Sequence, residues 1–271
     1  MKNLAARLVT GLLALSACFA SQLSSADQFA DIKAAGKLRI AIINGLPSFS
    51  VTDPKAGFTG SDVDTARLLA KDLGLTPEFV FVTNADRIDA MESKKADLII
   101  SALSITPERE QLIAFSVPYS SIALIIAAPR QYAITSYADL RGKKVGVGRN
   151  TSNGSLLKQN SNGVEIIEYE DERSLIEGYL KGQFDIISCQ HATLKEINNM
   201  VSDRRLEAKF IQREFQIAVG MRKSERALRE WVNNWVVSNL ANGRLNDIFR
   251  RHHGHELPES VLPKQVVPRR I

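Results

Sequence analysis

The chain has 271 residues, of which 44% are hydrophobic and 24% charged, and its net charge at pH 7 is +5. This length suits two lobes of roughly 100–150 residues each, and the composition is that of a folded globular protein. A charge surplus this small, without lysine and arginine runs between aromatic residues, argues against a nucleic-acid partner.

The first 26 residues are predicted to be an export signal. Lys2 and Arg7 form its charged start, residues 8–20 form a short apolar core, and a small-x-small cleavage site ends at Ala26. The apolar core is shorter than the roughly 20 residues that span a bilayer. Residues before Cys18 also resemble a lipobox, in which this cysteine becomes a lipidated N-terminus, so two processing routes stay open. Either route places the protein outside the cytoplasm, and we expect it in the periplasm.

Strands and helices alternate in the first half of the chain. Strands are predicted at 38–43, 78–82 and 97–100, and helices at 62–74 and 87–93. The acids at the start of the first helix and the glycine at its end suit those positions. This order of elements favours a largely parallel sheet.

A second unit of the same kind follows. Strands are predicted at 143–147, 165–169 and 184–188, with helices starting near residue 155 and covering 174–181. A strand at 215–221 precedes a long helix from about residue 224 to 242, whose apolar residues recur every three to four positions. Two such units predict two lobes, joined by crossovers near 120–128 and 213–217, with a ligand cleft between them.

Residues 101–109, directly after the strand at 97–100, have the composition of an anion-binding site. Ser101 and Ser104 bring hydroxyl groups, and Arg109 brings a planar guanidinium group that matches a carboxylate. In open α/β sheets ligands bind beyond the carboxyl ends of the strands, which is where this run is expected. The alternative is a surface turn whose arginine pairs with a neighbouring glutamate.

Four motifs, in order and spacing, resemble those of the bacterial solute-binding proteins of family 3, which serve polar amino-acid ABC transporters. They are GSDVD at 60–64, SITPER at 104–109, FSVPY at 115–119 and DLRGKKVGV at 139–147. The resemblance extends from about residue 38 to 255. It implies an α/β type II periplasmic-binding-protein clamp, in which each lobe is a mostly parallel sheet flanked by helices, with two hinge crossovers. Lobe 1 would comprise 27–121 and 217–271, and lobe 2 would comprise 122–216.

The resemblance also implies how such a protein works. A monomer without a cofactor closes over one small solute and delivers it to the permease of an ABC transporter. Arg109 is expected to pair with the solute carboxylate with help from Ser104, while Ser101 and Ala102 line the same pocket, Ala102 through its backbone. Thr151 and Ser152 would present N–H groups of a helix start to the same carboxylate, although Thr151 has an N-cap role as its alternative. Further residues are expected to set the size of the pocket: Leu46, Phe49, Asn84, Gln190 and His191.

Two acids that are common in the family are missing. Gln190, followed by His191, stands where binders of α-amino acids usually have an aspartate, and Ile43 stands where a second acid is common. A buried ammonium group without an anionic partner is costly. Either Asp62 or Asp86 replaces the missing acid, or the solute has no primary ammonium group, as in an organic acid, an opine or an amide. Gln190 and His191 would then bind its other end through neutral hydrogen bonds.

Two other functions on the same fold stay open. Cyclohexadienyl dehydratases share the clamp but carry a catalytic glutamate where this chain has Thr193, and His191 is then the titratable group of that segment. The second alternative is a diffusible ligand-sensing partner of a membrane receptor. His252, His253 and His255 lack a matching set of carboxylate or cysteine ligands, so no metal site is predicted.

Overall fold

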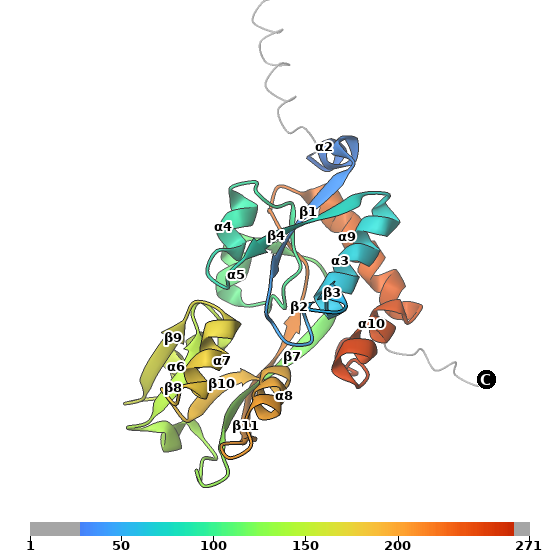
Figure 1. Cartoon of the computed structure of the whole chain (residues 1–271). Helices are drawn as coiled ribbons and strands as arrows, with labels where there is room; N and C mark the ends of the chain where they lie inside the picture. Colours follow the sequence, from blue (N-terminus) through green and yellow to red (C-terminus); the bar gives the residue numbers. More distant parts are fainter. Residues whose placement is uncertain (1–27, 263–271) are drawn as a thin grey trace, which may run out of the picture.

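Two five-stranded sheets, one in each of two lobes, organise residues 28–262, which are the residues that the computed structural model describes (Figure 1). The predicted export signal, including Cys18, lies outside this range. Within residues 28–262, no helix has both the length and the apolar content needed to cross a bilayer. The predicted two-lobe α/β architecture is confirmed.

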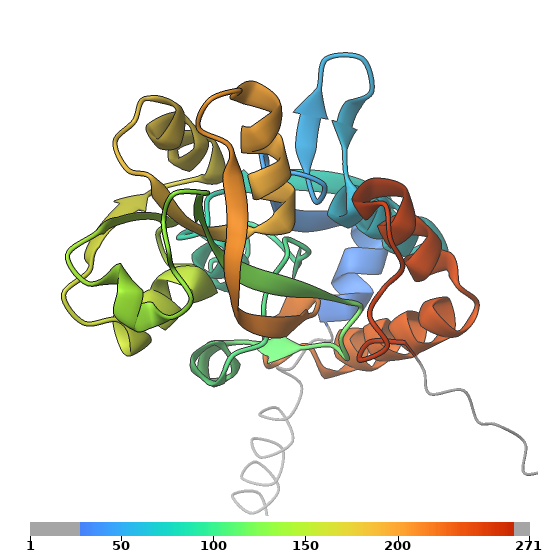
Figure 2. The ribbon, with the colours of Figure 1, turned by 90° about the horizontal axis from the view of Figure 1, so that it is seen from below.

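The first sheet draws on both halves of the chain. Its strands, in spatial order, are β4 (Thr76–Val82), β1 (Lys37–Ile43), β5 (Leu98–Ile99), β12 (Gly220–Met221) and β6 (Ala114–Phe115). The helices of this lobe are α2 (Gln28–Ala35), α3 (Ser61–Leu73), α4 (Arg87–Glu92), α5 (Pro107–Leu112), α9 (Arg226–Ala241) and α10 (Arg244–His253). A hairpin of β2 (Val51–Asp53) and β3 (Gly57–Thr59) approaches the second lobe, and Figure 2 shows it beside the helix α8 (His191–Met200).

The second sheet forms the other lobe. Its strands, in spatial order, are β11 (Leu206–Ile217), β7 (Ser120–Pro129), β10 (Ile186–Gln190), β8 (Lys144–Gly148) and β9 (Glu165–Tyr169). Its helices are α6 (Ser152–Asn160), α7 (Glu172–Leu180) and α8, with a short 3₁₀ turn at Tyr137–Leu140.

Both sheets are mixed rather than mostly parallel. β1 pairs in parallel with β4 and β5, and β8 pairs in parallel with β9 and β10. The antiparallel pairs involve β12 in the first sheet and β7 and β11 in the second. The prediction of parallel pairing therefore holds for strands that are connected through a helix, because such a crossover lets the second strand run in the same direction as the first. The other strands carry the chain between the lobes or bring it back.

Each sheet is covered on both faces. In β7, Ile125 and Ala127 belong to one hydrophobic cluster, while Ile126 and Ala128 belong to another. Successive side chains of a strand point to opposite faces, so these two clusters lie on the two sides of the sheet. A sheet that is buried on both faces leaves its edges and strand ends as the places for a binding site.

β7 and β11 connect the two lobes as a pair of antiparallel strands (Figure 1). Their pairing runs from Leu206 opposite Pro129 to Ile217 opposite Ser120. At the lobe 1 end, Ser104 forms an isolated bridge with Ile217. These strands are the two predicted crossovers, and they bring the run after β5 next to the connection between the lobes.

Two helices of the second lobe begin earlier than the sequence predicts. α6 begins at Ser152 instead of residue 155, because the hydroxyl group of Thr151 accepts a hydrogen bond from the Gly154 amide at 3.2 Å. α7 begins at Glu172 instead of residue 174, with the carboxylate of Asp171 as its N-cap. Of the residues gained at the two helix starts, Ser152, Asn153 and Glu172 face the region between the lobes.

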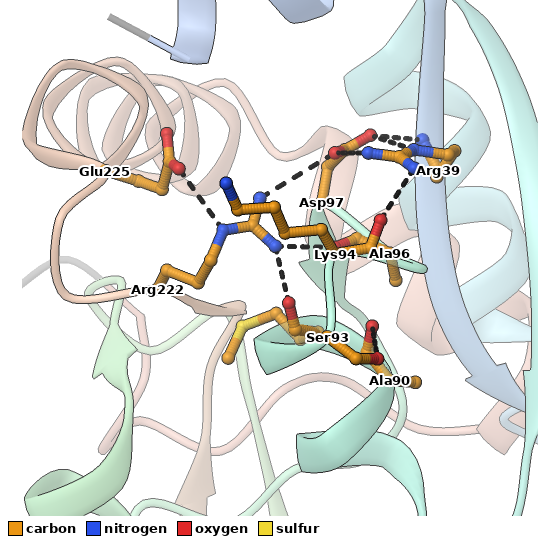
Figure 3. A network of polar contacts seen from close by, with 9 residues as sticks. Arg39, Ala90, Ser93, Lys94, Ala96, Asp97, Arg222 and Glu225 are labelled. Atoms are coloured by element: carbon orange, nitrogen blue, oxygen red, sulfur yellow. Dashed lines mark hydrogen bonds and ion pairs between the residues drawn. The ribbon is translucent and has the colours of Figure 1, made fainter. Parts of the chain in front are cut away.

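A buried polar network ties the returning end of the chain to the first sheet (Figure 3). Arg222, next to β12, donates to the carbonyl groups of Met91 and Ala96 at 2.6 and 2.7 Å. Arg39 of β1 holds the Asp97 carboxylate with two side-chain hydrogen bonds of 3.1 and 2.6 Å. Since Arg222 also lies 3.7 Å from Asp97, the two arginines share this buried carboxylate. The network joins segments that are more than a hundred residues apart.

Candidate functional site

A cavity of about 50 Å³ lies between the lobes. This is room for a few water molecules or a small solute, given that one water needs roughly 10–15 Å³. Both lobes and the connecting strand β7 supply its walls. The lining residues are Leu46, Asn84, Arg87, Ala102, Ser104, Ile122, Leu124, Gly148, Thr151, Ser152, Asn153, Glu172, Ser188 and Gln190.

Arg109 connects the two lobes beside this cavity. Its Nη1 atom donates to the Ser104 carbonyl group at 2.9 Å and to the Ser152 hydroxyl group at 3.3 Å. Its Nη2 atom donates to the Asn150 carbonyl group at 3.3 Å. Burial lowers the pKa of Arg109 to about 10, so it remains a cation at neutral pH. A guanidinium group in this position is suited to binding a carboxylate that both lobes share.

The start of α6 supplies donors on the second lobe. Thr151 is the N-cap of this helix, and its hydroxyl group also donates to the Gly148 carbonyl group at 2.7 Å. Thr151 and Ser152 both line the cavity. Because the first N–H groups of a helix lack partners within the helix, this end of α6 favours an anion.

The residues after β5 divide between the cavity wall and the structure behind it. Ala102 and Ser104 line the cavity. Ser101 is fully buried, and its hydroxyl group accepts a hydrogen bond from the Ile43 amide at 3.1 Å. The Ala102 amide donates to the Asp62 carboxylate at 2.7 Å, so the backbone donor expected to serve the solute is already bonded. Ala102 has a φ of 43°, a left-handed conformation that is uncommon for residues other than glycine.

Asp62 and Asp86, the two acids expected to replace a missing aspartate, do not line the cavity. Asp62 is buried and also accepts a hydrogen bond from the Tyr119 hydroxyl group at 2.7 Å. Burial raises its pKa to about 6, although both hydrogen bonds oppose this shift. Asp86 is exposed and accepts a hydrogen bond from the Thr83 hydroxyl group. Asp62 therefore supports the loop after β5 from behind.

Arg87 is a cavity residue that the sequence analysis missed. It comes from the first turn of α4, is 4% exposed, and donates from Nη1 to the Ser101 carbonyl group at 2.9 Å. Its Nε atom is buried without a hydrogen-bond partner among residues 28–262. Burial and the nearby Arg109 lower the pKa of Arg87 well below its ordinary value. A charged residue at a helix position that faces the sheet is the sequence signal that could have identified it.

Glu172 is the second charged residue of the cavity wall that the sequence did not predict. It is the first residue of α7 and is 5% exposed. Its carboxylate accepts a hydrogen bond from the Thr193 hydroxyl group and another from the Gln190 side-chain amide at 3.4 Å. Burial raises the pKa of Glu172, while these two hydrogen bonds oppose the rise. The prediction that α7 begins at residue 174 left Glu172 in a loop and hid its position.

The remaining predicted residues fall into two groups. Leu46, Asn84 and Gln190 line the central cavity. Phe49 and His191 instead line a separate groove, together with the histidines near the end of α10. In that groove the Phe49 ring packs edge-on against His253 at 4.6 Å between centroids. Phe49 and His191 thus do not line the central cavity. Within residues 28–262, no group of histidine, cysteine and acidic residues is arranged to hold a metal ion.

Comparison with known proteins identifies the family and supports the fold. A family model described as bacterial extracellular solute-binding proteins, family 3, matches residues 38–255. The L-cystine-binding protein TcyJ of Escherichia coli (strain K12) is 26% identical over 241 residues, which cover 86% of this chain and 91% of that protein. The ABC transporter glutamine-binding protein GlnH of Bacillus subtilis (strain 168) is 24% identical over 238 residues, with 86% of both chains covered.

A solved structure is similar over nearly its whole length. The crystal structure of the solute receptors for L-cysteine of Neisseria gonorrhoeae is 26% identical, with a TM-score of 0.77. The match covers 86% of this chain and 96% of that one. The predicted type II periplasmic-binding-protein fold is therefore confirmed.

Proposed function

Because the chain belongs to the bacterial extracellular solute-binding proteins of family 3, whose members matched here bind amino acids, we propose that it captures one small carboxylate-bearing solute. The solute, an amino acid or a close chemical relative, occupies the cavity between the lobes. The protein then delivers it to the permease of an ABC importer. The observation that carries this proposal is the position of Arg109, whose guanidinium group contacts both lobes beside the cavity.

The carboxylate couples binding to closure of the lobes. Arg109 belongs to the first lobe, whereas Thr151 and Ser152 belong to the second. A carboxylate held by both needs the lobes to be close together, so the solute favours the closed arrangement by its greater affinity for it. The hinge lies in β7 and β11, which carry the chain between the lobes.

Arg87 adds a second cation to the same region. Its Nε atom has no partner among the described residues, and the side chain lines the cavity. An unpaired buried donor is costly, and a solute oxygen would satisfy it. We therefore place the carboxylate where Arg109, Arg87 and the start of α6 come together.

Export and assembly complete the proposal. The predicted signal in the first 26 residues would send the protein to the periplasm, either free or anchored through Cys18. We propose that it acts there as a monomer. The rims of the two lobes, brought together on closure, would form the surface that the permease recognises.

A thermal-shift screen followed by calorimetry tests the proposal. The purified protein would be incubated with L- and D-amino acids, L-cystine, opines, carboxylic acids and amides. A solute that binds only the folded state adds roughly 2.7 kcal/mol of stability at a hundredfold excess over its Kd. We expect a shift with at least one carboxylate-bearing solute and none with the corresponding carboxamide. A screen in which no carboxylate raises the melting temperature would contradict the proposal.

The dehydratase alternative is the less favoured function. The matched relatives are binding proteins, and Thr193 stands at the position of the catalytic glutamate in that alternative. In this protein the Thr193 hydroxyl group donates to Glu172. Glu172 lines the cavity, whereas His191, the titratable group expected for a dehydratase, does not. We expect prephenate and arogenate to remain unchanged when their absorbance is followed in the presence of the protein.

A further inference from the structure

Glu172 is a buried carboxylate in the wall of the solute cavity, and its partners are neutral. Its side chain accepts hydrogen bonds from Thr193 and from Gln190, and no cation within residues 28–262 forms an ion pair with it. The negative charge of the neighbouring Asp171 raises the pKa of Glu172 further. A carboxylate that is buried without a cationic partner is energetically unfavourable. A cationic group that enters the cavity would therefore stabilise the charged form of Glu172.

Among residues 28–262, Glu172 is the one acidic side chain in the cavity wall, so a cationic group would bind beside it. Arg87, Arg109 and the start of α6 all favour negative charge, as described above. Among the residues lining the cavity, Glu172 is the acidic one. A solute with charges of both signs would therefore place its anionic group toward the arginines and its cationic group toward Glu172.

We infer that Glu172 binds the α-ammonium group of the solute, and that the solute is consequently a zwitterionic amino acid rather than an organic acid or an amide without a cationic group. This inference rests on the proposed function and specifies its substrate class. This acid comes from the first turn of α7, whereas the aspartate that is usual in the family aligns with Gln190 of this chain. Gln190 would then be a positioning residue, since its amide holds the Glu172 carboxylate at 3.4 Å.

The alternative is that Glu172 only stabilises the second lobe. In that case its hydrogen bonds would hold α7, β10 and α8 together, and removing its charge would not change which solutes bind. Glu172→Gln separates the two roles, because glutamine has nearly the same size and keeps a carbonyl oxygen for the Thr193 hydroxyl group. Glu177→Gln is the matched control, because it removes one negative charge from an exposed position of the same helix.

The experiment measures Kd by calorimetry for free L-amino acids, including L-cystine, L-cysteine and L-glutamine, and for their N-acetyl derivatives and 2-hydroxy acid analogues. We expect wild-type protein to bind a free amino acid and to bind its N-acetyl derivative roughly a hundredfold more weakly. Glu172→Gln should lose about the same factor for the free amino acid, whereas Glu177→Gln should bind as wild type does. Melting temperatures of the free proteins verify that each variant is folded.

A second variant restores the charge from the neighbouring position. In the double variant Glu172→Gln/Gln190→Asp the amide and the carboxylate exchange places, so their mutual contact can be kept. We expect this variant to recover most of the affinity that Glu172→Gln loses. A purely structural role for Glu172 gives no reason for such a recovery.

The outcomes separate the inference from the proposed function. If folded Glu172→Gln binds the free amino acid as tightly as wild type while Arg109→Ala does not, the inference is wrong and the proposed function stands. The same holds if wild type binds 2-hydroxy acids or N-acetyl derivatives and no free amino acid. If no carboxylate of the panel binds wild type, the proposed function fails and the inference fails with it.

Discussion

The Nη1 atom of Arg109, in α5 of the first lobe, lies 3.3 Å from the Oγ atom of Ser152, the first residue of α6 in the second lobe. A single side chain thus spans the two lobes at the point where the cavity is lined by both. Hydrogen bonds to the carbonyl groups of Ser104 and Asn150 fix the orientation of its guanidinium group. This relationship links solute binding to the distance between the lobes.

Replacing Arg109 tests that link directly. Arg109→Ala should weaken binding of the carboxylate solute by more than about tenfold, because it breaks a partly buried charged interaction. Calorimetry with the best solute of the screen measures the change. Arg149→Ala is the control, because Arg149 is an exposed arginine in the turn before α6 and pairs with Glu170. Equal effects of the two substitutions would contradict the assigned role of Arg109.

The start of α6 should matter less for affinity than for stability. Thr151→Ala removes the N-cap hydrogen bond to the Gly154 amide, which should cost about 1 kcal/mol of unfolding free energy. The backbone N–H groups remain, so Kd should rise by less than about fivefold for Thr151→Ala and for Ser152→Ala. Urea denaturation and calorimetry on the same preparations give both values. A loss of affinity as large as that of Arg109→Ala would show that the hydroxyl groups themselves carry the binding.

Asp62 predicts a pH dependence of stability. Its pKa is about 6 in the folded protein against an ordinary value of 3.8, so folding favours its protonated form. Asp62 therefore contributes about 3 kcal/mol to the free energy of unfolding below about pH 4. This contribution is lost as the pH rises through 6.

Asp62→Asn is the variant that reveals this titration. An asparagine can accept from the Ala102 amide and donate to the Tyr119 oxygen, so it replaces the protonated acid. The unfolding free energy of the variant, relative to wild type, should rise by about 3 kcal/mol between pH 4 and pH 8. Asp86→Asn, at an exposed position, serves as the control. A difference that stays constant with pH would mean that Asp62 does not titrate in this range.

Replacing Arg222, which lies far from the cavity, should lower the stability of the protein strongly. Arg222→Ala leaves two buried carbonyl groups and part of the Asp97 charge without a donor, which should cost about 3 kcal/mol. Arg226→Ala, at an exposed position one turn further, should change stability by less than about 0.5 kcal/mol. Chemical denaturation measures both. If Arg222→Ala is as stable as the control, the network in Figure 3 is not a stabilising one.

Much of the fold could be predicted from the sequence because the signals are local. Apolar periodicity located strands such as 38–43, which the structure has as β1, and glycine marked the end of α3, where Gly74 adopts a left-handed conformation with a φ of 73°. The arrangement of hydroxyl groups and Arg109 after a strand end also depends on neighbours in the chain. The same is true of the N-cap at Thr151. Such features follow from backbone geometry within a few residues.

Only the tertiary structure decided which side chains line the cavity. Glu172 and Arg87 enter it from the first turns of α7 and α4, and a shift of two residues in a helix start decides whether a side chain faces the cavity or the solvent. Asp62 lies on the expected helix but bonds to Tyr119 and Ala102 behind the wall, while His191 lies outside the central cavity next to Gln190, which lines it. Local sequence determines which element forms, but the meeting of distant elements determines which of its side chains share one cavity, because that depends on packing between segments far apart in the chain.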